Sequence, residues 1–372
     1  MTLRAGDWVE VRSKREILES LDTQGRLDSL PFMPQMFQYC GKQFRVYKRA
    51  HKTCDTVNQT GGRWLTDGIH LELRCDGMAY GGCQAGCLIF WKEAWLKPVG
   101  QARRSEVYPA HAGVFKSDQV INKPLCSEDD VWRATRVEDQ RSGEEEIYSC
   151  QATQLPSFTK LLPWWNVRQY IEDYASGNVT LRSILGGFVS GGCHRIGQTR
   201  FRQIASPIQR LYNWFQTFRS GDPVARKSKN TPAALPIPTC APTLQPGNLV
   251  RVKSRKDILA TLDAGSKNAG LFFDVEQVPY CRRRYRVKSR VVRFIDEKTG
   301  KMKLLKTPAV ILEGVWCRSR YSTCRLFCPR SIYSWWREAW LEKVIESSPG
   351  HSIAAREGSR LRVFKRPEQF PS

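Results

Sequence analysis

The sequence predicts an α+β protein in which two homologous, small, β-rich and barrel-like domains flank a mainly helical insert. Three observations lead to this fold class: a long internal repeat, strand-type alternation of apolar residues within each copy, and helical spacing of apolar residues between the copies. The chain has 372 residues, which suits about two domains. Its apolar content of 41% and aromatic content of 11% favour packed cores over a disordered chain.

The repeat relates residues 6–49 to residues 247–290. The segment Gly6-Asp-Trp-Val-Glu-Val-Arg-Ser13 recurs as Gly247-Asn-Leu-Val-Arg-Val-Lys-Ser254, and 15 of the 44 aligned positions are identical without a gap. The similarity resumes near Leu71 and ends where Trp91-Lys-Glu-Ala-Trp-Leu96 matches Trp336-Arg-Glu-Ala-Trp-Leu341. So much identity without a gap indicates an internal duplication.

Each copy reads as strand, short helix, strand, strand and a closing aromatic segment. Short apolar runs and alternation predict strands around Trp8–Val11 and Phe44–Val46, whereas apolar residues at helical spacing predict a helix over Lys14–Asp22. The tryptophans of the closing segment, such as Trp91 and Trp95, are four residues apart, which places them on one face if the segment is helical. We interpret them as the core of a small domain, and a binding groove is the alternative.

Two resemblances accompany this pattern. Gly6 before a Val-rich strand, Gly41 before Phe44-Arg-Val46, and a final Trp-x-x-x-Trp-Leu followed by Val99 resemble Src-homology-3-like small barrels of the KOW and Tudor kind. The whole chain also resembles an uncharacterised family of bacterial cysteine-rich proteins, through YCG-x-x-FRV at 39–46 and GGC-x-x-GC-LIFWKEAWL at 81–96. The second resemblance implies a duplicated domain and no established activity.

The predicted domain boundaries follow the repeat. They are 1–100 for the first cysteine-rich β-domain, 101–220 for a connector and helical insert, 221–246 for a Pro-rich linker, 247–345 for the second, basic cysteine-rich β-domain, and 346–372 for a mobile polar tail. Within the insert, helices are predicted over 162–174 and 201–218, because apolar residues recur there at spacings of three and four.

Cysteines suggest a metal site in each copy. The candidate ligands are Cys40, Cys75, Cys83 and Cys87 in the first copy and Cys281, Cys317, Cys324 and Cys328 in the second. Four thiolates complete a structural zinc site, so zinc is the favoured cofactor, although the chain has no C-x-x-C knuckle. Thiols packed as small apolar groups, disulfides and, last, an iron–sulfur cluster are the alternatives.

Further cysteines and histidines lie outside these sets of four. His51 and Cys54 have no counterpart in the second copy, where Val292 and Ile295 stand instead, so they either complete a variant metal site or serve the first copy alone. Cys126, Cys150, Cys193 and Cys240 remain; they either pair with one another or are core residues, and Cys240 in the Pro-rich linker is a candidate for an exposed thiol. Cys193 and His194 are adjacent in a glycine-rich segment. We interpret this segment as a turn, and a catalytic pair of nucleophile and base is the alternative.

Positive charge is concentrated in the second copy. The formal net charge of the chain is +23, and residues 247–344 carry 22 basic and 9 acidic side chains, which leaves 22 − 9 = +13. The predicted polyanion-binding residues are Arg282, Arg283, Arg284, Arg286, Lys288 and Arg290. Alternate side chains of a strand share one face, so most of these residues form a row that suits successive phosphates. The alternative is an edge strand that uses charge against aggregation.

These observations favour a non-enzymatic protein that binds nucleic acid or another polyanion. No catalytic residue is assigned, because the sequence contains no HExxH, GxSxG, P-loop or dinucleotide-binding motif. A metal- or thiol-dependent enzyme of a bacterial biosynthetic pathway, using His51 and Cys54, is the first alternative. A scaffold that binds a partner protein through the helical insert is the second. The lack of a long apolar segment and of a secretory signal predicts a cytoplasmic protein without membrane contact.

Overall fold

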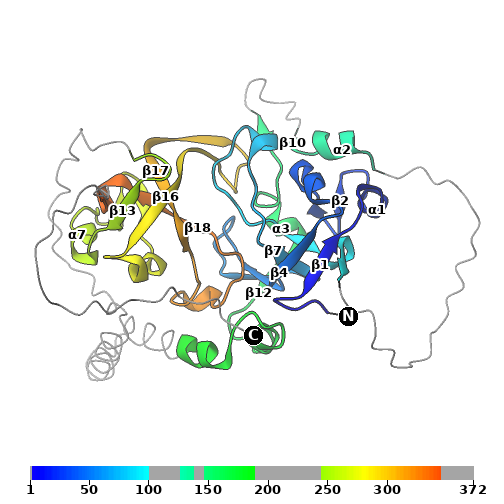
Figure 1. Ribbon diagram of the computed structural model, residues 1–372, viewed down its shortest axis with the longest axis horizontal. Coiled ribbons are helices and arrows are strands. Elements are labelled where there is room, and N and C mark those ends of the chain that lie inside the picture. Colours follow the sequence, from blue (N-terminus) through cyan, green and yellow to red (C-terminus); the bar gives the residue numbers. More distant parts are fainter. Residues whose placement is uncertain (1, 100–125, 138–145, 189–243, 345–372) are drawn as a thin grey trace, which may run out of the picture.

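Two five-stranded antiparallel sheets dominate the computed structural model, which describes residues 2–99, 126–137, 146–188 and 244–344 (Figure 1). The first sheet has the strand order β8-β7-β4-β1-β9, with β1 (Trp8–Val11), β4 (Gln43–Arg49), β7 (Gly68–Leu71), β8 (Trp91–Lys92) and β9 (Leu96–Pro98). The second has the order β18-β17-β16-β13-β19, with β13 (Leu249–Val252), β16 (Arg284–Ile295), β17 (Met302–Trp316), β18 (Tyr333–Arg337) and β19 (Leu341–Lys343).

The two sheets repeat each other strand for strand. In β1 and β4, Trp8 lies opposite Arg45, and in β13 and β16 the aligned Leu249 lies opposite Arg286. The last strand of each copy returns to pair with its first strand. Helices and antiparallel strands confirm the α+β class, and the duplication in sequence is a duplication in strand order. The predicted barrel closure is not found: within the described residues no sheet closes on itself.

Local sequence explains the helix that follows the first strand of each copy. In α1 (Lys14–Ser20), the Ser13 hydroxyl accepts a hydrogen bond from the Glu16 N–H, and the Glu16 carboxylate accepts one from the Ser13 N–H. This reciprocal capping satisfies two backbone donors at the helix start. In α7 (Arg255–Leu259), the Ser254 hydroxyl caps the helix by accepting a hydrogen bond from the Asp257 N–H. The predicted helix at 14–22 is therefore confirmed, two residues shorter at its end.

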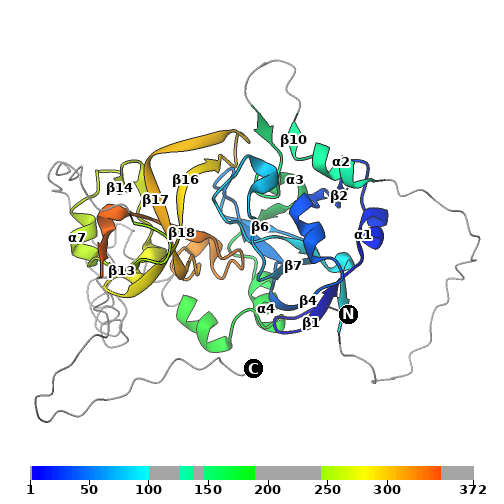
Figure 2. The same cartoon turned by 45° about the horizontal axis from the view of Figure 1, so that its top comes forward.

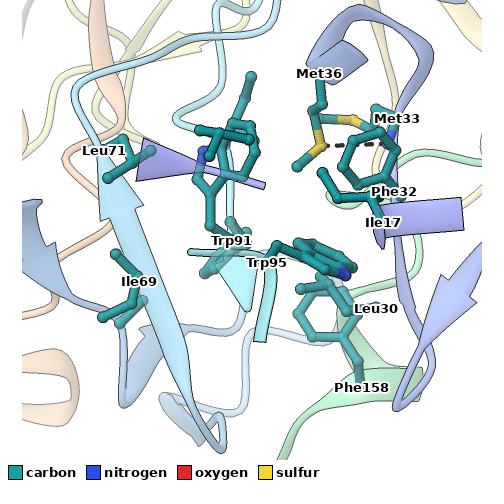
Figure 3. Close-up of a cluster of buried hydrophobic side chains, with 14 of the residues drawn as sticks. Ile17, Leu30, Phe32, Met33, Met36, Ile69, Leu71, Trp91, Trp95 and Phe158 are labelled. Atoms are coloured by element: carbon teal, nitrogen blue, oxygen red, sulfur yellow. Dashed lines mark hydrogen bonds between the residues drawn. The ribbon is translucent and has the colours of Figure 1, made fainter. Parts of the chain in front are cut away.

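Each copy has an aromatic core built from the same positions. Trp91, Trp95 and their counterparts Trp336 and Trp340 are fully buried, and Figure 3 shows the first pair among Phe32 and aliphatic side chains. The edge of Trp95 meets the Phe32 ring with centroids 5.2 Å apart, and the equivalent rings in the second copy are 5.3 Å apart. The interpretation of these tryptophans as core is confirmed. Their segment is a strand followed by the 3₁₀ turns η3 (Glu93–Trp95) and η6 (Glu338–Trp340), and not an α-helix.

The described part of the insert contains both helices and short strands. They are α2 (Glu128–Arg133), β10 (Arg136–Val137), β11 (Ile147–Tyr148), α3 (Leu155–Phe158), β12 (Lys160–Leu162) and α4 (Arg168–Ala175), with helical backbone again at 181–188. β12 pairs with β6 (Gly62–Trp64), which pairs with β5 (Lys52–Cys54), so the insert extends a sheet of the first copy. The helix predicted over 162–174 begins only at Arg168, because Leu162 belongs to β12.

Shorter elements complete the description. They are β2 (Arg26–Leu27), β3 (Leu30–Pro31), η1 (Pro34–Tyr39), η2 (Met78–Tyr80), β14 (Lys267–Asn268), β15 (Leu271–Phe272), η4 (Val275–Tyr280) and η5 (Thr323–Arg325). No helix in these ranges is long and apolar enough to cross a membrane. The predicted helix at 201–218, most of the Pro-rich linker and the predicted tail lie outside the described residues.

The long hairpin of β16 and β17 reaches from the second copy to the first, and Figure 2 shows its far end beside the first copy. Ile295, at the end of β16, is buried in the core of the first copy. The Gln84 side chain accepts a hydrogen bond of 2.7 Å from the Val292 N–H, and the Gln84 N–H donates to the Arg293 carbonyl at 3.1 Å. Backbone and core contacts thus join the two copies.

The paired tryptophans differ in one hydrogen bond, which gives a test of the core. Trp340 donates its indole N–H to the Thr261 hydroxyl at 3.0 Å, whereas the buried indole N–H of Trp336 has no partner in the described residues. We expect Trp340→Phe to lower the free energy of unfolding by about 1–2 kcal/mol more than Trp336→Phe, since only the first change breaks a bond. Denaturant titration measures both values.

The first copy supplies the control for this prediction. Trp95 donates to the Ser20 hydroxyl at 3.2 Å, and the buried indole N–H of Trp91 lacks a partner among the described residues. Trp95→Phe is therefore expected to destabilise more than Trp91→Phe. If the two substitutions lowered the free energy of unfolding equally within each copy, this account of the cores would be wrong.

Candidate functional site

A cleft of about 570 Å³ lies between the two copies. The first copy contributes Tyr47, Glu72, Arg74 and Asp76, and the second contributes Lys288, Ser289, Arg290, Ile311, Trp316 and Tyr333. Concave sites that combine aromatic walls with a few charged groups are the usual places for ligands. The cleft is therefore the first candidate site in the described part of the chain.

One wall of the cleft is fixed by Arg74. Its guanidinium carbon lies 3.7 Å from the centroid of the Tyr333 ring, which is a stacked cation–π contact. The same guanidinium donates to the carbonyls of Gly86 at 2.9 Å and Ser331 at 2.8 Å. Burial lowers the pKa of Arg74, and the nearby Tyr333 and Cys87 oppose that shift. Arg74 thus binds side chains and backbone of both copies.

The basic residues of the second copy lie on β13, at the start of β16 and in the two residues before it. We call Arg251, Arg282, Arg283, Arg284, Arg286 and Lys288 the basic face, and all six are exposed. Val287 and Val291 of β16 point instead into apolar clusters and are fully buried. The printed pairs join Arg284–Arg286 to β13, and pairing of β16 with β17 begins only at Val287. One side of this segment is therefore a sheet edge, where charges also protect against aggregation.

Cross-strand pairing brings two of these charges together. Arg251 in β13 lies directly opposite Arg284 in β16. At the aligned positions of the first copy, Glu10 lies opposite Gln43, whose side-chain amide donates to the Glu10 carboxylate at 3.5 Å. Like charges in directly opposed positions are unfavourable in a sheet, so the second copy carries an arrangement that costs stability.

The predicted row of basic residues does not act as one unit. Arg290 forms an ion pair with Glu338 at 3.2 Å and donates to the Leu244 carbonyl at 3.0 Å, so its charge is largely balanced. The ammonium of Lys288 lies 6.0 Å from the centroid of the Tyr333 ring, at the cleft. The basic face therefore leads from Arg282 into the cleft and ends at Lys288.

Three of the four candidate ligands in the first copy line one small cavity. Cys75, Cys83 and Cys87 surround about 40 Å³ together with Cys150 from the insert, whereas Cys40 packs elsewhere against the first core. Burial raises the pKa of Cys75 to about 12, and burial also raises the pKa of Cys87 and Cys150. These thiols are protonated at neutral pH and pack as small apolar groups. The sequence did not single out Cys150 for this place.

The candidate ligands in the second copy lie in different places. Cys281 is part of the second core, and Cys317 lies beside Ser319 with a sulfur–oxygen distance of 3.4 Å. Cys328 contacts Cys54 of the first copy, and Cys324 lies in η5. In the part of the chain that the structure describes, no group of three or more His, Cys, Asp or Glu side chains is arranged to hold a metal ion.

Cys54 and Cys328 form a thiol pair at the junction of the copies. The Cys54 N–H donates a hydrogen bond of 3.1 Å to the Cys328 sulfur. Interaction with the Cys54 thiol, the nearby backbone N–H groups and the Arg330 charge lower the pKa of Cys328 to about 6, although burial opposes the shift. The same interaction and burial raise the pKa of Cys54 well above its ordinary value. Of the two thiols, Cys328 is therefore the one that loses its proton more readily.

Arg330 is the cation beside this pair. Its side chain is 2% exposed and donates to the Thr56 hydroxyl at 2.6 Å and to the Glu297 carboxylate at 3.2 Å. Burial works to lower the pKa of Arg330, but the Glu297 carboxylate and the nearby thiols of Cys54 and Cys87 outweigh it and raise the pKa. The guanidinium therefore stays charged inside the protein.

His51 does not serve Cys54 in this structure. The His51 ring contacts helix α4, with Nε2 3.2 Å from both the Asp173 carboxylate and the Gln169 carbonyl. Lys52 pairs with the same carboxylate, and its ammonium lies 4.9 Å from the centroid of the Tyr170 ring. These buried polar groups fasten α4 to the first copy. Cys126 is buried in the first core, while Cys193, His194 and Cys240 lie outside the described residues.

Comparison with known protein families, with curated proteins and with solved structures found no match to this chain. The resemblances to small barrels and to a bacterial cysteine-rich family therefore stay predictions. The assignment of function rests on the geometry of the chain itself.

The thiolate gives a pH-dependent prediction. In the unfolded chain Cys328 has an ordinary thiol pKa, so the lowered pKa in the folded protein contributes stability. That contribution is fully present above the ordinary value and is lost as the pH falls through about 6. We expect the ultraviolet absorbance of the folded protein to fall by the amount due to one thiolate near that pH. Cys328→Ser should abolish the step, and Cys40→Ser should keep it, because burial raises the pKa of Cys40. A step that survives in Cys328→Ser would contradict the assignment.

Proposed function

We propose that the protein is a non-enzymatic binding protein whose two copies form separate small β-rich domains, and that the basic face of the second copy binds nucleic acid. The observation that carries this proposal is a pair of exposed like charges in which Arg284 of β16 directly opposes Arg251 of β13. One charge is enough to protect an edge, whereas two directly opposed like charges cost stability. Phosphates of a polyanion would neutralise both.

The cleft supports single-stranded nucleic acid in particular. Alternate residues of a strand are about 6.6–6.8 Å apart, so Arg284, Arg286 and Lys288 present a row of cations to an extended backbone. The row ends at the cleft, whose walls include Trp316 and Tyr333; Arg74 already stacks on one face of the Tyr333 ring, so Trp316 is the main ring for a base. Aromatic rings in a positively charged groove stack on bases without regard to sequence. The arrangement combines phosphate contact with a place for a base.

In this proposal the cysteines brace the two copies by packing and by thiol contacts. Cys75, Cys83, Cys87 and Cys150 fill the surroundings of the small cavity, and Cys54 meets Cys328 where the copies join. Zinc, the cofactor expected from the sequence, has no gathered ligand set among the described residues and is not needed for this bracing.

A matched pair of variants tests the nucleic-acid site. Arg283 and Arg286 align with Lys42 and Arg45, and all four side chains are exposed. We expect Arg283→Gln/Arg286→Gln to weaken binding of a labelled single-stranded oligothymidylate about tenfold or more, because two phosphate contacts are lost. The slope of log affinity against log salt should fall in magnitude by about 1.4. Fluorescence anisotropy at several salt concentrations measures both quantities.

The control is Lys42→Gln/Arg45→Gln in the first copy. Arg45 donates to the Gly6 carbonyl at 3.0 Å and Arg286 to the Gly247 carbonyl at 3.1 Å, so both double variants remove two charges and one equivalent hydrogen bond. We expect the control to change affinity and slope little. Equal losses in the two variants would mean that net charge alone binds the oligonucleotide.

The insert favours protein–protein contact as a second candidate function. Residues 164–188 expose a group of large apolar side chains: Trp164, Trp165, Val167, Ile171, Tyr174, Leu181, Leu185 and Phe188. A concentration of exposed large apolar side chains is typical of interaction sites. A scaffold that binds a partner protein through the insert would use these side chains.

Charge introduced at Ile171 tests the second candidate. Ile171 lies in α4 and is 64% exposed, so Ile171→Asp leaves the cores intact. We expect the variant to bind less of an environment-sensitive apolar dye while its affinity for oligothymidylate stays unchanged. Dye fluorescence equal to that of the native protein would show that the apolar group is not an accessible surface.

A further inference from the structure

The thiol pair Cys54–Cys328 joins parts of the chain that are 274 residues apart. Cys54 ends β5 in the first copy, and Cys328 follows η5 in the second. Both side chains are 4% exposed, and both cysteines are free thiols. The Cys328 sulfur lies 3.1 Å from the Cys54 backbone nitrogen, so the two cysteines are direct neighbours in space.

Positive charge surrounds this pair. The guanidinium groups of Arg325 and Arg330 act on Cys54, and Arg330 acts also on Cys328. The ammonium of Lys52 is near enough to Cys328 to interact with it. Cations and backbone N–H donors stabilise a thiolate, and the thiolate is the form that reacts with oxidants. Cys54 stands beside it as a second thiol, the usual arrangement of a reactive and a resolving cysteine.

We propose that Cys54 and Cys328 are a modification site, at which a small hydroperoxide oxidises the pair to a disulfide that links the two copies. Burial of both sulfurs limits the oxidant to a small molecule such as hydrogen peroxide and excludes bulky disulfides such as oxidised glutathione. This proposal does not depend on nucleic-acid binding.

The reaction balances in two steps. The Cys328 thiolate attacks one oxygen of hydrogen peroxide, the O–O bond breaks, and hydroxide leaves; Cys328 becomes a sulfenic acid. The Cys54 thiol then attacks the Cys328 sulfur, a sulfur–sulfur bond forms, and the S–O bond breaks. The Cys54 proton and one further proton neutralise the two hydroxides that leave. A thiol, a thiolate and a proton thus react with one peroxide to give one disulfide and two waters. The two sulfurs supply the two electrons.

A disulfide here would cross-link the two copies where Arg330 already holds them. Closing a loop of this length restricts the unfolded chain strongly, so the oxidised protein should unfold at a higher temperature than the reduced protein. A thiol reductant should reverse the change.

Peptide mapping of the full chain tests the proposal. The protein is treated with hydrogen peroxide, free thiols are alkylated after denaturation, and digestion followed by mass spectrometry identifies linked peptides. We expect the peptide pair containing Cys54 and Cys328 to be the main linked product. It should disappear on reduction with dithiothreitol and be nearly absent after treatment with oxidised glutathione. The peroxide-treated protein should also unfold several degrees higher.

Variants make the test specific. Cys54→Ser and Cys328→Ser should each abolish the rise in unfolding temperature, and Cys40→Ser, which lies outside the pair, should keep it. The map of the native chain decides the question even if a variant fails to fold. Two results would overturn the proposal: linkage mainly among Cys75, Cys83, Cys87 and Cys150, or Cys54 and Cys328 recovered as free thiols while other cysteines are oxidised.

Discussion

Burial of the Arg330 guanidinium is the constraint on which the junction of the two copies depends. A charged group that is 2% exposed is tolerated only when it is paired, and removal of a partner from such a buried pair typically costs about 3–5 kcal/mol. Glu297 comes from the turn between β16 and β17, and Thr56 comes from the first copy. One side chain therefore holds the long hairpin, the segment before β18 and the first copy together.

The two copies share a framework and differ at the surfaces that matter for function. Both have the same strand order, the same capped helix and the same buried tryptophans. In the second copy the two central strands are extended into a hairpin of 12 and 15 residues, which contacts the first copy. The sheet positions held by Glu10 and Gln43 in the first copy are held by Arg251 and Arg284 in the second. The longer strands of the second copy form the junction with the first copy, and the change of charge at the sheet positions creates the basic face.

Local features were predictable from the sequence. The helix after Ser13 follows from its own capping residues, and the tryptophan core follows from a repeated motif in which large apolar residues are the only means of filling a small domain. Contacts between distant segments were not predictable. The pairing of Cys54 with Cys328 and the ion pair of Arg290 with Glu338 depend on how separate elements pack. β12 likewise takes Leu162 out of the expected helix because a strand of the first copy is available for pairing.

Nucleic-acid binding on the second copy is the central claim, and photo-cross-linking tests it most directly. A photoreactive oligothymidylate is bound to the full chain at physiological salt, irradiated, and the attached peptides are identified by mass spectrometry. The account predicts attachment within residues 282–290 and at the cleft residues Trp316 or Tyr333. Attachment mainly to residues 41–49, which occupy the same place in the first sheet, would contradict it, and so would the absence of any attachment.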